Sequence, residues 1–263
     1  VGDIVILRKA GDIIPEVVTP VYSKRTGLEK PYKMIENCPE CGSSLVKIDA
    51  MHFCLNRNCP SRNIEGLIHF ASKDAMDIDG MGEKVVQEFF DLRIIESITD
   101  IYNIREHRDQ IIAMDGWSHK SIDNLIAAIE KSKKNSLERL LVGLGIKEVG
   151  TKMAKVLARR FGNIDALMAV SEEELLNIND VGEVVAKSIC DYFKDKKNIE
   201  IINTLKSYNL NMEYLGQNKI EEGSFFFNKK VVLTGTLSKY GRKEATEILE
   251  NLGAHVSGSV SKV

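Results

Sequence analysis

Ile78-Asp79-Gly80-Met81-Gly82 is the first of four similar five-residue segments in the middle of this 263-residue chain. The other three are Met114-Asp115-Gly116-Trp117-Ser118, Ile146-Lys147-Glu148-Val149-Gly150 and Ile178-Asn179-Asp180-Val181-Gly182, and successive starts lie 36, 32 and 32 residues apart. Each segment is followed by a pattern typical of a helix. A period in this range indicates a repeated supersecondary unit. The sequence therefore predicts four copies of a helix, a tight hairpin and a second helix, and we number the hairpins one to four.

The hairpins are candidate binding sites for a polyphosphate backbone. A hairpin that opens onto a helix N-terminus presents free backbone amides at the positive end of the helix dipole. Glycine lets a phosphate approach these amides without a clash against a Cβ atom. Three copies also carry a lysine two positions after the hairpin, where it can pair with the same phosphate. The candidate contacts are Gly80, Gly82, Lys84, Gly116, Lys120, Gly150, Lys152 and Gly182.

The alternative for each hairpin is a structural corner that only packs two helices together. Hairpins three and four carry Glu148 and Asp180 where the first two have glycine, and Val184 replaces the lysine after hairpin four. A carboxylate turned toward a phosphate would repel it, so we expect these two hairpins to bind less directly or mainly to pack. Trp117 at the second hairpin either stacks against nucleic acid or plugs the protein as an apolar side chain.

Composition and charge limit the class of protein. Apolar residues make up 43% and charged residues 28% of the chain, as in soluble globular proteins of two or more domains. No run of 18 apolar residues occurs, so no membrane span is predicted. The net charge is −2, but residues 119–160 hold ten Lys or Arg against four Asp or Glu. This excess is typical of a nucleic-acid footprint or of a solvated helix face.

Four of the five cysteines follow the spacing of a metal site. Cys38 and Cys41 form a C-x2-C pair, and after twelve residues Cys54 and Cys59 form a C-x4-C pair. Two such thiolate pairs can surround one tetrahedral Zn²⁺, and four protein ligands leave no open position, so the metal is predicted to be structural. The alternative is two disulfides, which an intracellular chain without a signal peptide disfavours. Cys190 is predicted to be a buried apolar side chain.

The predicted fold is multidomain and mainly α. Residues 1–22 read as a pair of strands and 38–60 as the cysteine module, while residues 61–215 are helical. A polar linker is expected at 216–224, and residues 225–263 read as the start of an α/β domain. Because Val1 begins within a predicted strand, we expect the chain to be part of a longer protein.

The order of these modules resembles the C-terminal half of bacterial NAD⁺-dependent DNA ligases. Residues 5–15 look like the end of that family's OB domain, and residues 38–60 look like its four-cysteine zinc finger. Residues 144–150 are similar to its third hairpin, and residues 231–237 resemble the opening of a BRCT domain. The resemblance covers nearly the whole chain.

The resemblance implies an enzyme that seals nicks in duplex DNA during replication and repair, in a bacterial cytoplasm and near the nucleoid. In this family a lysine within Lys-x-Asp-Gly is adenylated from NAD⁺. Residues 77–80 lack that lysine, so we expect no catalytic residue here and expect the NAD⁺ and Mg²⁺ sites upstream. The implied role of this segment is to clamp nicked double-stranded DNA as a monomer, with Arg8 and Lys9 near the nick.

The rival hypothesis is a non-enzymatic DNA-repair scaffold, or a nuclease subunit with tandem helix-hairpin-helix motifs. A Lys-x-Asp-Gly segment upstream of Val1 would decide for the ligase.

Overall fold

The computed structural model describes residues 1–11, 13–56, 58–178, 180–216, 224–226, 229–235, 237 and 239–257. Most of the expected linker at 216–224 and the last six residues lie outside this described part. The described part is mainly helical with three two-stranded sheets. Contacts divide the chain into two compact units, residues 1–61 and 62–263.

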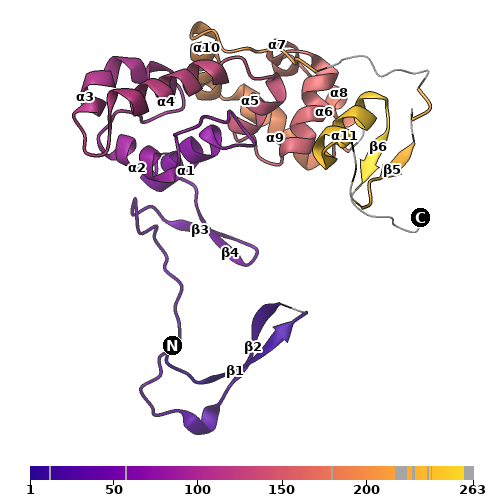
Figure 1. The fold of residues 1–263 in the computed structure, drawn as a ribbon. Coiled ribbons are helices and arrows are strands. Elements are labelled where there is room, and N and C mark those ends of the chain that lie inside the picture. The colour runs from indigo at the N-terminus through magenta and orange to yellow at the C-terminus, as the bar shows by residue number, and fades with distance from the viewer. Residues whose placement is uncertain are drawn as a thin grey trace. The chain divides into compact units, whose positions relative to one another are not determined.

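The first unit contains two antiparallel hairpins, visible as separate pairs of arrows in Figure 1. Its elements are β1 (Val5–Ala10), β2 (Ile14–Pro20), the 3₁₀ turn η1 (Tyr22–Lys24), β3 (Leu45–Ile48) and β4 (Met51–Cys54). Strand β1 is exposed along its whole length although more than half of its residues are apolar. The β-hairpin formed by β3 and β4 ends at Cys54 and thereby presents one of the four cysteines.

The second unit begins with a helical domain that contains the four predicted hairpins. Its elements are α1 (Pro60–Ala71), α2 (Glu83–Asp91), η2 (Asp100–His107), α3 (Arg108–Ile112), α4 (His119–Ser132), α5 (Leu137–Gly143), α6 (Thr151–Phe161), α7 (Ile164–Met168), α8 (Glu172–Leu176), α9 (Glu183–Lys194) and α10 (Lys196–Ser207). The hairpins join α1 to α2, α3 to α4, α5 to α6 and α8 to α9. The four helix-hairpin-helix units are therefore present as the period predicts.

The first and fourth residues of every hairpin point into one hydrophobic core. Ile78 and Met81 are buried, as are Ile146 and Val149, and the corresponding residues of the other two hairpins are buried or pack against the same core. The helices contribute their apolar faces to this core. Burial of two side chains three positions apart fixes each hairpin against the domain, and those middle residues that the structure describes are exposed.

The C-terminal part forms a β-α-β unit. Strand β5 (Lys230–Val232) pairs in parallel with β6 (His255–Ser257), and α11 (Arg242–Asn251) connects them. This order of strand, helix and strand agrees with the start of an α/β domain expected for residues 225–263. Cys190 is buried in α9, as predicted. Among the described helices, none is both long and apolar enough to cross a bilayer.

Candidate functional site

All four hairpins have the same type of backbone turn. In each, the backbone N–H of the fourth residue donates to the carbonyl of the first, at 3.0–3.3 Å. The third residue has a positive φ in every copy: 89° at Gly80, 81° at Gly116, 66° at Glu148 and 70° at Asp180. Glycine adopts this conformation freely, whereas Glu148 and Asp180 are held in it against their preference. The sequence alignment of these four positions is therefore also a structural equivalence.

Three of the four hairpins leave the following helix N-terminus open. Gly82, Gly150 and Gly182 are the N-cap residues of α2, α6 and α9, and none of these helices has a side-chain cap. At the second hairpin, Ser118 accepts from the backbone N–H of Ser121 in a capping box. Helix α4 therefore satisfies one of its own amides, whereas α2, α6 and α9 present their first amides to the surface.

The predicted lysines lie on the first turns of these helices. Lys84, Lys120 and Lys152 are exposed, and Val184 is exposed at the corresponding place in α9. The Lys152 ammonium lies 3.4 Å from an Asp180 carboxylate oxygen, so it forms an ion pair with the fourth hairpin. The sequence places each lysine correctly but gives no sign of this pair, because the two residues are 28 positions apart.

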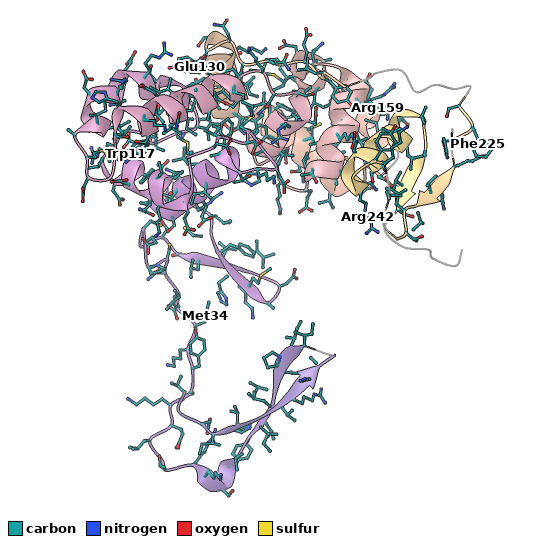
Figure 2. All side chains as sticks on the ribbon, viewed as in Figure 1. Met34, Trp117, Glu130, Arg159, Phe225 and Arg242 are labelled. Carbon is teal, nitrogen blue, oxygen red and sulfur yellow. The ribbon has the colours of Figure 1, made fainter. Side chains whose placement is uncertain are left out.

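Hairpins one and two are connected through α2. The Trp117 ring lies 5.2 Å from the Phe89 ring, and its Nε1 atom lies 3.5 Å from a carboxylate oxygen of Glu88. Trp117 is half-buried and packs against the hydrophobic core (Figure 2). Of the two readings of this residue, the structure supports the apolar plug.

Hairpins three and four are connected directly. Ser188 of α9 donates a hydrogen bond of 2.7 Å to the backbone carbonyl of Lys147 in hairpin three. Together with the ion pair between Lys152 and Asp180, this bond holds the two hairpins side by side. The four hairpins thus form two neighbouring pairs on one domain.

Arg108 is a charged residue near the second hairpin that sequence reasoning missed. Its Nη2 atom lies 3.4 Å from Nδ1 of His119, the first residue of α4. Arg108 also forms an ion pair of 2.9 Å with Asp123. The sequence carries no sign of this approach, because it depends on how α3 packs against α4. Arg8 and Lys9 lie exposed on β1 in the first unit, where Arg8 is paired with Glu16 at 2.8 Å.

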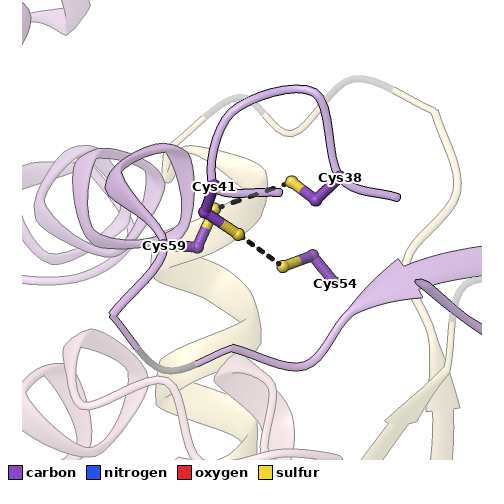
Figure 3. A group of neighbouring side chains, drawn as sticks. All are labelled: Cys38, Cys41, Cys54 and Cys59. Atoms are coloured by element: carbon purple, nitrogen blue, oxygen red, sulfur yellow. Dashed lines mark hydrogen bonds between the residues drawn. The ribbon is translucent and has the colours of Figure 1, made fainter. Parts of the chain in front are cut away.

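The four predicted cysteines form one cluster (Figure 3). Their sulfur atoms all lie within 4.8 Å of one another, with 3.9 Å between Cys38 and Cys59 and 3.5 Å between Cys41 and Cys54. Zn–S bonds of about 2.3 Å in a tetrahedron place sulfurs about 3.8 Å apart. A disulfide requires about 2.05 Å. The residues therefore fit a structural Zn²⁺, and all four cysteines are free of disulfides.

Backbone turns and hydrogen bonds position these sulfurs. The Cys38 N–H donates to the Ser43 carbonyl, and Gly42 closes the first turn with a φ of 70°. Hydrogen bonds from Ser43 and Asn56 lower the pKa of the Cys41 thiol to about 6. At Cys54 a backbone hydrogen bond from Asn56 lowers the pKa, but desolvation and the neighbouring sulfurs outweigh it and raise the pKa to about 12. Crowded sulfurs of this kind need a cation before all can be thiolates.

Comparison with known proteins matches the cysteine cluster and part of the helical domain to described families. Residues 37–60 match the family described as the NAD-dependent DNA ligase C4 zinc finger domain, and residues 139–202 match the helix-hairpin-helix motif. The chain is 48% identical over 267 residues to a DNA ligase of Brevibacillus brevis and 46% identical over 265 residues to that of Anoxybacillus flavithermus. It covers 40% and 39% of these relatives, and they cover 100% and 99% of this chain. The resemblance to DNA ligases is confirmed, as are the four-cysteine finger and the helix-hairpin-helix motif, while the likeness to an OB end and a BRCT opening stays a prediction. The chain spans about two-fifths of the length of the curated relatives.

Proposed function

Because the whole chain is similar to a part of the bacterial DNA ligases, we propose that it is the DNA-gripping region of an NAD⁺-dependent DNA ligase. Such an enzyme joins a 5′-phosphate to a 3′-hydroxyl at a nick in duplex DNA, in the bacterial cytoplasm and near the nucleoid. The adenylated lysine and the NAD⁺ and Mg²⁺ sites belong to the remainder of that protein. The match of residues 37–60 to a finger named for NAD-dependent ligases favours this proposal over a repair scaffold or a nuclease subunit.

One observation carries the proposal: four exposed hairpins of the same backbone geometry lie on one domain in two connected pairs. Amides at helix N-termini and ammonium groups are the usual partners of phosphate oxygens. Duplex DNA offers such oxygens at regular intervals along both of its backbones. A domain with repeated phosphate-binding hairpins suits this ligand better than a single small anion.

The hairpins are not equivalent as phosphate ligands. The first and third combine open amides with an exposed lysine, Lys84 or Lys152. The second has Lys120, but its capping box already uses one amide, and the fourth has open amides but Val184 in place of lysine. We therefore assign the strongest contacts to the first and third hairpins, through Gly80, Gly82, Gly150 and the two lysines. For the third hairpin this departs from the expectation drawn from Glu148, because its open amides and Lys152 favour phosphate binding. Gly116, Lys120 and Gly182 contribute less.

Contacts to phosphates carry no base code. The domain is therefore expected to bind without sequence preference, facing the minor groove. The Zn²⁺ in the finger has no chemical step to perform, because four thiolates complete its coordination. It stabilises the segment that connects β1–β2 with the helical domain. Arg8 and Lys9 of β1 are expected to contact the backbone near the nick.

The proposal is tested by the salt dependence of DNA binding. Fluorescence anisotropy of a labelled nicked duplex, titrated with the zinc-loaded chain between 50 and 200 mM salt, should give a slope of roughly −0.9 for each phosphate contacted. Changing both Lys84 and Lys152 to methionine should make the slope shallower by about two units. The control is Lys47→Met, which removes an exposed lysine from β3 of the zinc finger. A flat salt response of the unmodified chain would refute the phosphate grip.

The assignment to a ligase is tested on the longer protein that contains this chain. With NAD⁺ and Mg²⁺ it should seal nicked duplex, and covalent AMP should map outside residues 1–263. AMP bound covalently to a lysine within this chain would contradict the assignment.

A further inference from the structure

We propose that Asp180 holds Lys152 in the free protein and thereby weakens the grip of the third hairpin on phosphate. This role rests on the proposed function, because it assumes that Lys152 contacts the DNA backbone. It makes the fourth hairpin a competitor for the cation of the third hairpin, beside the weaker phosphate contact assigned to Gly182.

The geometry carries the inference. Asp180 is the third residue of its hairpin, the position that turns outward, and its carboxylate lies 3.4 Å from the Lys152 ammonium. The side chains are 66% and 86% exposed, so both remain accessible to a passing duplex. The hydrogen bond from Ser188 to the Lys147 carbonyl keeps the two hairpins in place and so keeps the two charged groups within reach.

The backbone of this hairpin does not require aspartate. Asp180 has a φ of 70°, a conformation in which glycine is unstrained and Asp or Asn is tolerated. Hairpin four also has Val184 where the other hairpins have lysine, so it brings no cation of its own to a phosphate. The cation that the Asp180 carboxylate pairs with is therefore Lys152 of the neighbouring hairpin. A phosphate that approaches Lys152 must replace that carboxylate.

The first test is the affinity of Asp180→Asn for nicked duplex. Asparagine removes the charge and tolerates positive φ, so the hairpin keeps its turn, which thermal unfolding verifies. Exposed ion pairs are weak, so we expect binding about two- to fivefold tighter at low salt. Binding equal to or weaker than that of the unmodified chain would overturn the inference.

The second test separates the ion pair from general repulsion of DNA. In a Lys152→Met background, Asp180→Asn should change the affinity no more than the control below does, because the carboxylate then has no lysine to hold. Glu148→Gln is the matched control, since it removes a carboxylate from the same position of hairpin three and should have the same small effect in both backgrounds. An equal gain from Asp180→Asn in both backgrounds would show simple repulsion and refute the pairing.

Failure of this inference differs from failure of the proposed function. If the unmodified chain binds duplex with a steep salt dependence and Asp180→Asn changes nothing, only the role of Asp180 falls. If neither the unmodified chain nor any variant binds DNA, the proposed function falls first.

Discussion

Gly80 and Gly82 lie two residues apart, yet their replacement by alanine is expected to have different effects. Gly80 has a φ of +89°, which costs an L-residue roughly 1–2 kcal/mol. A Cβ atom there would find the Leu125 Cδ1 atom at 3.6 Å, an ordinary contact. Strain of the backbone, not crowding, therefore sets the loss. Gly82 has a φ of −77° and a ψ of 172°, which any residue can adopt, and a Cβ there would meet nothing within 4 Å.

These values predict a clear separation in two assays. In a domain of about 150–250 residues, 1 kcal/mol shifts Tm by roughly 2–4 °C, so Gly80→Ala should lower Tm by about 2–8 °C in calorimetry. Gly82→Ala changes stability by about 0.5 kcal/mol or less, because a poorer cap and a stiffer unfolded chain offset each other. The added methyl group, however, stands where a phosphate would approach the open amides, so DNA binding should weaken.

The outcome that refutes this reasoning is specific to each variant. An unchanged Tm for Gly80→Ala would mean that the left-handed turn is not maintained in solution. Unchanged DNA affinity for Gly82→Ala, measured at a salt concentration where binding is half-maximal, would mean that no phosphate approaches the first hairpin.

Three further changes test other parts of the structure. Cys59→Ser should abolish the binding of one Zn²⁺ per chain, measured by native mass spectrometry. Acid should release the metal from the unmodified chain, because only thiolates bind it. Metal retained by the variant would contradict the four-cysteine site. Ser118→Gly should open the second hairpin at a cost of only a few tenths of a kcal/mol and tighten DNA binding, and weaker binding would speak against the role of its amides. Trp117→Ala should lower the free energy of unfolding by about 3 kcal/mol, since the ring packs on Phe89. The chain has one tryptophan, so the variant has no tryptophan fluorescence and its unfolding is followed by circular dichroism. A negligible change would show that the ring does not stabilise the core.

Local spacing predicted the features that depend on neighbouring residues. The cysteine spacing identified all four members of the cluster, because two short turns suffice to bring each pair of sulfurs together. The period of 32 to 36 residues located all four hairpins, because each one buries its first and fourth residues against the same core. The capping box between Ser171 and Glu174 is likewise a local feature, because the two residues are three positions apart.

Features that depend on distant contacts could not be predicted in this way. The ion pair between Lys152 and Asp180, the packing of Trp117 on Phe89 and the approach of Arg108 to His119 each join residues at least 11 positions apart. They follow from how the helices pack, and a single sequence shows the apolar faces of helices without showing which faces meet. The sequence also suggested that Glu148 and Asp180 replace glycines, but only the structure shows that the turn is retained.

The alternation of inward and outward residues in the hairpins has a consequence for how this domain can change. The first and fourth positions secure the turn, and the amides that follow it belong to the main chain. The third position must accept a positive φ, and Gly, Glu and Asp stand there with the turn retained. Substitutions among such residues can therefore adjust the strength of attachment hairpin by hairpin, at a cost to stability of roughly 1–2 kcal/mol where glycine is replaced.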